Sequence, residues 1–324
     1  MTLAISALLA EGELPAARID SFLASHNAPI VEGRTVTFLY RGEADAVFLQ
    51  HWIFGLTSAQ PFTQVVGSDL WYLTQEIPVR SRVEYKLEVQ RGDVSRLIRD
   101  PLNSQLAHDP FGANSVCQGA EYQVPDWISP DPEARPGTLE KHRVSSTALG
   151  GSQELQIYLP ARFRSRRRYP LLIVHDGSDY LHFSVLKTVL DNLIHRLEVA
   201  PMIVALTQSR QRLRDYAAQA DHSRFLAEEL VPALEARYPL QKGPASRGLM
   251  GASFGGVAAL AAAAHYPGQF GRLLLQSGSF AFTDIGPSRR GPAFEPVVEF
   301  VNGFRDAPKR LARLPTGHVR EDVD

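Results

Sequence analysis

A serine framed by glycines stands in the segment LMGASFGGVAAL, residues 249–260, with the spacing G-A-S-F-G around Ser253. A serine hydroxyl attacks a carbonyl only when a general base takes its proton and hydrogen-bond donors stabilise the oxyanion that forms. The spacing is typical of a nucleophile elbow, a strained strand-to-helix turn in which bulky neighbours would clash. It therefore predicts acyl transfer with Ser253 as nucleophile. A glycine-rich turn without a catalytic role is the alternative.

Backbone amides around this turn are candidates for an oxyanion hole. Phe254 opens the predicted helix after the serine, where N–H groups and the helix dipole point at developing negative charge. A second donor is needed from the loop after another strand, and the segment IVHDGSDY supplies one through Gly177 or Ser178. An ordinary strand-end turn is the alternative at that loop.

The general base and the acid should follow Ser253 in the order acid, then histidine. His318 is the one histidine after His265, and it follows a glycine. Asp284 and Asp306 are the weak candidates for the acid. His318 stands in the polar run RLPTGHVREDVD, where no predicted strand or helix would fix its position, so a histidine on a loose tail is the alternative.

An arginine-rich segment, SRQRLRDY, follows a predicted strand at the sheet end where α/β enzymes bind ligands. Arg212 and Arg214 in this segment are candidates for holding an anionic substrate, because a guanidinium donates in a planar fork. A solvated basic loop is the alternative.

Composition excludes several classes of function. A net charge of −1 gives no electrostatic reason to expect a nucleic-acid or membrane partner. The single cysteine, Cys117, excludes an internal disulfide and a cysteine metal cluster, so we expect no metal and no cofactor. The start of the chain lacks a basic n-region, and no apolar run approaches the ~20 residues that span a bilayer. We expect a soluble, cytoplasmic protein, and the sequence predicts no oligomeric state.

The two halves of the chain differ in pattern. Residues 36–124 carry short β-branched and aromatic runs of period two, which predict a small antiparallel, Ig-like sandwich. Beyond a proline-rich stretch, apolar strand-like runs alternate with helical patterns, which predicts an α/β domain with a mostly parallel sheet. The predicted organisation is a helical segment over 1–28, a sandwich over 29–127, a linker over 128–137 and an α/β-hydrolase domain over 138–324.

Three segments resemble segments of a known family that follow one another in the same order along the chain. They are YLPARFRSRRRYPLLIVHDGSDY, FLAEELVPALEARYPL and RGLMGASFGGVAALAAAAHYPGQFGRLLLQSGSF. They resemble the enterochelin esterases and related esterase-D-type α/β-hydrolases, and the sandwich with GSDLWYLTQEIP, YKLEV and DPLN is similar to that family's N-terminal domain. The resemblance implies ester hydrolysis through an acyl-serine. In the best-known branch it implies a cyclic catecholate siderophore trilactone as substrate, cleaved in the cytoplasm, so that iron arrives only inside a ferric siderophore.

The resemblance fades after about residue 300. The family's acid-bearing strand and its Gly-His segment are not recognisable, which suggests a truncated or frameshifted hydrolase. A vestigial scaffold that binds ligand without turnover is therefore the second hypothesis. A carbohydrate-binding protein led by the sandwich is a third, although Trp52, Trp71 and Trp127 fit a packing role better than a sugar platform.

Overall fold

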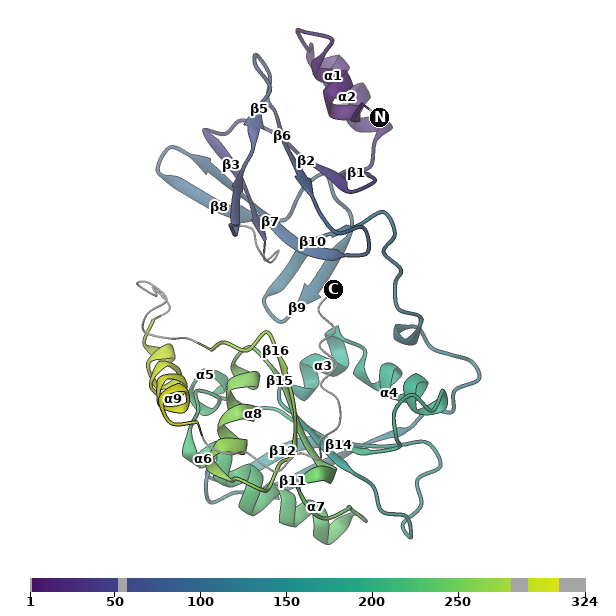
Figure 1. Cartoon of the computed structure of the whole chain (residues 1–324), viewed down its shortest axis with the longest axis vertical. Helices are drawn as coiled ribbons and strands as arrows, with labels where there is room; N and C mark the ends of the chain where they lie inside the picture. Colours follow the sequence, from purple (N-terminus) through teal and green to yellow (C-terminus); the bar gives the residue numbers. More distant parts are fainter. Residues whose placement is uncertain (1, 52–56, 281–290, 309–324) are drawn as a thin grey trace. The chain divides into compact units, whose positions relative to one another are not determined.

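The computed structural model describes residues 2–51, 57–280 and 291–308, and the chain forms two compact units. The first unit is Met1–Pro125 and the second is Asp126–Asp324 (Figure 1). The first holds antiparallel β-sheets and the second a mixed, mostly parallel sheet with helices, so the predicted fold class is confirmed. Within the described ranges, no helix has the length and apolar character needed to span a bilayer.

Two antiparallel sheets form the body of the first unit, with the orders β1-β2-β6-β5 and β4-β3-β7-β10-β9, and β8 also pairs with β7. Phe38, Leu49 and Leu87 come from both sheets and share one buried cluster, because alternate residues of each strand face the space between the sheets. The strands are β1 Ile30–Glu32, β2 Thr35–Arg41, β3 Ala46–His51, β4 Ala59–Pro61, β5 Thr63–Gln64, β6 Leu70–Glu76, β7 Arg82–Arg91, β8 Val94–Ile98, β9 Leu106–Asp109 and β10 Gly112–Gln118.

The N-terminal segment contains two helices, α1 (Ala4–Leu9) and α2 (Ala16–Ser25). Gly12 adopts a φ of 89° between them, and Pro15 stands at the N-cap of α2, so the segment cannot continue as a single helix. Their apolar residues pack with Leu39, which points away from the cluster between the sheets.

The structure adds two details to the first unit, a hairpin in a polar stretch and the role of a tryptophan. The polar stretch after residue 99 contains a hairpin, β9 and β10, although it lacks the period-two apolar runs of the other strands. The hairpin lacks apolar alternation and is specified by pairing with β7, for example Ser115 with Tyr85. Trp71 is buried and its indole N–H donates to the Gly42 carbonyl at 3.2 Å, which is a packing role, whereas Trp52 lies outside the described residues.

The second unit is built on a six-stranded sheet with the order β11-β12-β14-β13-β15-β16. The pairs β11–β12 and β12–β14 are antiparallel, and the other three pairs are parallel. The strands are β11 Thr138–Ser145, β12 Ser152–Leu159, β13 Leu171–Val174, β14 Ile203–Thr207, β15 Arg247–Ala252 and β16 Arg272–Gln276.

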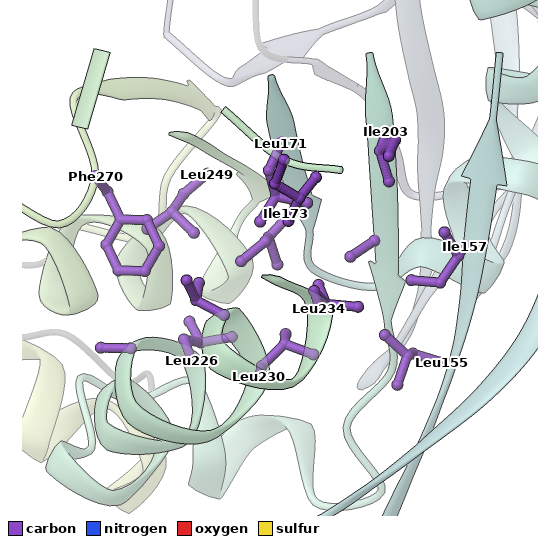
Figure 2. Packing of buried hydrophobic residues seen from close by; sticks show 14 of the residues in the cluster. Leu155, Ile157, Leu171, Ile173, Ile203, Leu226, Leu230, Leu234, Leu249 and Phe270 are labelled. Carbon is purple, nitrogen blue, oxygen red and sulfur yellow. The ribbon is translucent and has the colours of Figure 1, made fainter. Parts of the chain in front are cut away.

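Helices cover both faces of this sheet. Figure 2 shows the apolar core on one face, where Ile173 and Leu249 of the sheet pack with Leu230 and Leu234 of the helices. The opposite face packs against α4 (Leu186–His195). The remaining helices are α3 Gly177–Phe183, α5 Arg212–Asp215, α6 Ala220–Arg224, α7 Val231–Arg237, α8 Phe254–His265 and α9 Glu295–Asp306, with short η1 Asp126–Ile128, η3 Pro244–Ser246 and η4 Pro292–Phe294.

Residues 220–237 form three consecutive helical elements and contain an internal proline. A π-helical turn, η2 (Phe225–Leu230), separates α6 from α7, and Pro232 lies in the first turn of α7. Proline has no N–H and so cannot donate to a carbonyl of the preceding turn. The wider π turn stands directly before α7, where the hydrogen-bond pattern of the helix changes.

The order of the central strands fixes where a ligand site can form. The chain runs from β13 outward to β14 on one side, and returns to place β15 on the other side of β13. The loops at the carboxyl ends of β13 and β15 therefore diverge from each other. Such a switch point is where open α/β sheets bind ligands.

Candidate active site

Ser253 lies at this switch point, between β15 and α8, with a φ of 55° and a ψ of −121°. A non-glycine residue in this region is strained by about 1–3 kcal/mol and persists only where its surroundings impose the conformation. Here the Ser253 N–H donates to the Gln276 carbonyl at 3.0 Å, and the Ser279 N–H donates to the Ser253 carbonyl at 3.1 Å. The end of β16 thus anchors the strained turn.

Close backbone approach explains the glycines around the serine. A Cβ on Gly251 would come within 2.4 Å of the Gly255 backbone. A Cβ on Gly255 would come within 3.2 Å of the His175 side chain and 3.4 Å of the Asp176 carboxylate. The small residues therefore let α8 start directly against the end of β13.

The Ser253 hydroxyl has a serine as its hydrogen-bond partner. Its Oγ lies 2.8 Å from the Oγ of Ser279, three residues beyond β16. Among the residues that the structure describes, no histidine makes a hydrogen bond with Ser253. Ser253 as a residue is half-buried.

The base and acid candidates are not brought to Ser253 in the described ranges. His318 and Asp284 both lie outside the residues that the structure describes. Asp306 is the exposed last residue of α9, where its carboxylate pairs with Arg305 at 2.9 Å. The role of His318 therefore stays a prediction from chain order.

Two backbone amides remain candidates for the oxyanion hole. Phe254 opens α8 and Gly177 opens α3, and the first N–H groups of a helix have no intrahelical acceptor. The Ser178 N–H instead donates to the side-chain oxygen of Gln208 at 3.3 Å. Of the two candidates in the loop after β13, Gly177 is thus the better placed. It must be glycine, because a Cβ there would come within 2.5 Å of Leu206.

The Arg212 guanidinium makes its hydrogen bonds to other residues of the same unit. Its Nε donates to Asp176 Oδ2 at 2.8 Å, and its Nη2 donates to the Ala252 carbonyl at 3.2 Å. Burial raises the pKa of the Asp176 carboxyl, and the charge of Arg212 opposes that rise. Arg214 is exposed and pairs with its neighbour Asp215 at 3.4 Å. The two arginines of the predicted substrate site therefore lie in different surroundings.

A buried imidazole pair lies behind the elbow. The His175 Nδ1–H donates to the Met250 carbonyl at 3.1 Å, so its Nε2 accepts from His222 Nε2–H, also at 3.1 Å. Burial lowers the pKa of His175 to about 4 and that of His222 well below its usual range. Both rings are therefore neutral and hydrogen-bonded to these partners, so neither is free to act as a base for Ser253.

Two residues of the site escaped the sequence patterns. Asp176 had a signal, because it stands directly before the glycine of the proposed oxyanion loop and two residues after the end of β13. Ser279 had a weaker one, the S-G-S run after the apolar strand. Only the packing of β16 beside β15 places the Ser279 hydroxyl next to Ser253.

Comparison with known proteins finds similarity to esterases. The esterase family model, described as "Putative esterase", matches residues 146–284, which include β12 to β16 and Ser253. An iron(III) enterobactin esterase of Escherichia coli O6:H1 is 26% identical over 298 residues, covering 80% of this chain and 74% of its own. The protein YjcH of Bacillus subtilis is 28% identical over 148 residues, covering 44% of this chain. The match spans 62% of that relative's length.

Solved structures show the same fold across both units. The enterochelin esterase of Shigella flexneri aligns with a TM-score of 0.64 and 22% identity, covering 89% of this chain and 81% of its own. The enterobactin esterase from the same organism, solved in the presence of enterobactin, aligns with a TM-score of 0.62 and 23% identity, covering 81% of this chain and 76% of that one. The resemblance predicted from the quoted segments is confirmed: the chain is similar to iron(III) enterobactin esterases over 80% of its length, and its residues 146–284 match the esterase family model.

Proposed function

We propose that this protein is a serine esterase that hydrolyses carboxylic ester or lactone bonds with Ser253 as nucleophile. The strained backbone of Ser253 carries the proposal, because the fold holds a serine in a costly conformation at the switch point of the sheet. A structural turn would be satisfied by glycine without that cost.

The reaction follows from the atoms around the elbow. Ser253 Oγ attacks the ester carbonyl while a base takes its proton, and the carbonyl oxygen becomes an oxyanion that accepts from the Phe254 and Gly177 N–H groups. Collapse of the tetrahedral intermediate expels the alcohol, which takes back the proton. Water then attacks the acyl-serine by the same route and releases the acid. His318 is the base we propose, from its place after Ser253 in the chain.

The proposed substrate class is a catecholate siderophore ester, such as a cyclic trilactone in its ferric form. Two relatives support this class. One is an iron(III) enterobactin esterase at 26% identity, and the other is the enterobactin esterase of Shigella flexneri, solved in the presence of 2,3-dihydroxy-N-benzoyl-serine. The family resemblance implies a cytoplasmic site of action for this chemistry. The proposed substrate class therefore follows from these relatives.

A second function stays open, a scaffold that binds the ligand without turnover. The observation that favours it is the partner of the Ser253 hydroxyl, which in the described part of the chain is Ser279 and not a histidine. A serine without a base reacts slowly with esters and with organophosphorus probes.

One labelling experiment separates these functions. The wild type, Ser253→Ala and Ser279→Ala are treated with a fluorophosphonate probe, and the adduct is located by peptide mass. The esterase proposal expects one adduct on Ser253, absent from Ser253→Ala and present in Ser279→Ala. A folded wild type that takes no adduct would favour the binding scaffold.

A further inference from the structure

We propose that Arg212 and Asp176 form a positioning pair that fixes the distance between the two oxyanion donors. This inference rests on the proposed esterase function. It reassigns Arg212 from the anionic substrate, where the sequence pattern placed it, to the alignment of the site.

A single guanidinium joins the ends of two strands. Arg212 Nε donates to Asp176 Oδ2 at 2.8 Å, and Nη2 of the same side chain donates to the Ala252 carbonyl at 3.2 Å. Asp176 is the residue directly before Gly177, and Ala252 is the residue directly before Ser253. The arginine therefore ties the loop that carries one oxyanion donor to the elbow that carries the other.

The same helical turn holds Asp176 a second time. Tyr216, four residues after Arg212, accepts from the Asp176 backbone N–H through its hydroxyl at 3.4 Å. The Arg212 guanidinium carbon lies 5.8 Å from the centroid of the Tyr216 ring, and that ring is fully buried. Side chains at positions i and i+4 of one turn face the same way. Both hydrogen bonds to Asp176 thus come from α5 and its C-cap residue.

Burial makes this pair costly to break. The Asp176 side chain is 8% exposed and that of Arg212 is 25% exposed. Asp176 Oδ1 is buried without a hydrogen-bond partner among the described residues, so Arg212 is the main compensation for this carboxylate. Removal of one partner from such a pair leaves an uncompensated buried charge. A fold that only needed to fill this space would place an apolar residue there.

The geometry of an oxyanion hole explains why such a pair matters. The donors must lie about 2.7–3.1 Å from the position that the oxyanion will occupy. A displacement of ~1 Å at a catalytic site can cost about 10²-fold in rate. Lysine is a compact point charge and cannot reproduce the two-acceptor fork of arginine, so Arg212→Lys keeps the charge and loses the alignment.

The test compares Arg212→Lys and Asp176→Asn with a matched control, Arg196→Lys. Arg196 has nearly the same exposure, 26%, and pairs with Asp126 at 2.7 Å and Asp131 at 3.8 Å at the far end of α4. For each protein we would measure the rate constant of fluorophosphonate labelling, the kcat and KM for an activated aryl ester, and the Tm. Asp176→Asn preserves side-chain shape and keeps the test valid if Arg212→Lys does not fold.

The expected result is a labelling rate and a kcat lowered at least tenfold in both variants, with KM within about twofold and the control unchanged. Labelling and kcat that match the control in folded variants would overturn the positioning role and leave the esterase proposal standing. A raised KM with unchanged kcat would assign Arg212 to substrate binding instead. A wild type that is never labelled would overturn the esterase function, and the positioning role with it.

Discussion

The hydroxyl oxygens of Ser253 and Ser279 lie 2.8 Å apart, each just beyond the carboxyl end of one of two neighbouring parallel strands. Either serine could donate in this bond, and only Ser253 has the strained backbone of an elbow. Because the two hydroxyls are neighbours, either of them could in principle be the nucleophile.

Replacement of Ser279 shows which of the two serines is the nucleophile. We expect Ser279→Ala to lower the labelling rate by less than tenfold, because the variant loses one neutral hydrogen bond but keeps the elbow and its N–H donors. Peptide mapping should still find the adduct on Ser253. An adduct that disappears with Ser279 and survives in Ser253→Ala would make Ser279 the nucleophile.

Replacement of His318 tests the proposed base. We expect His318→Ala to lower kcat by about 10²–10⁴-fold, the usual contribution of general acid–base catalysis, with little change in KM. His195→Ala is the control, because His195 is an exposed residue at the end of α4. Steady-state kinetics on an activated ester measure both values. An unchanged kcat in His318→Ala would remove this histidine from the mechanism.

The buried imidazole pair predicts how stability depends on pH. Burial lowers the pKa of His175 to about 4, whereas an unfolded histidine titrates near its usual value of about 6.5. Between these pH values the unfolded state binds a proton that the folded state does not, so the free energy of unfolding falls as the pH falls. The slope is at most ~1.4 kcal/mol per pH unit for one histidine.

Denaturant unfolding between pH 7 and pH 4 measures this slope. We expect His175→Gln to have a shallower pH dependence than the wild type, with the exposed His195→Gln matching the wild type. His222 contributes in the same direction, so some slope should remain in His175→Gln. Equal slopes in the wild type and His175→Gln would contradict a neutral His175 in the folded state.

The glycine before the elbow predicts a large steric effect from a small substitution. A Cβ on Gly251 would come within 2.4 Å of backbone atoms of Gly255, so Gly251→Ala should cost about 1–3 kcal/mol and slow labelling of Ser253. Gly303 is the matched control, because it lies in α9 with open space around it. Gly303→Ala should stabilise by about 0.5–1 kcal/mol. Thermal unfolding compares the two, and a Gly251→Ala variant as stable as the wild type would contradict the close approach.

The sequence by itself determined the fold class, the order of strands and helices in the second unit, and the turn that carries Ser253. These features depend on local rules: period-two and helical apolar patterns, and the glycines that a strained turn requires. The same rules missed the hairpin of β9 and β10, whose polar residues are held by pairing with β7.

Only the tertiary structure decided what surrounds the serine. Arg212, Asp176 and Ala252 are distant in sequence and meet because β14, β13 and β15 lie side by side in the sheet. Ser279 reaches Ser253 for the same reason, through β16 beside β15. The sequence of a basic segment is the same whether its arginines face solvent, a substrate or a buried carboxylate. The partner of each charge is set by long-range packing, and no local pattern records it.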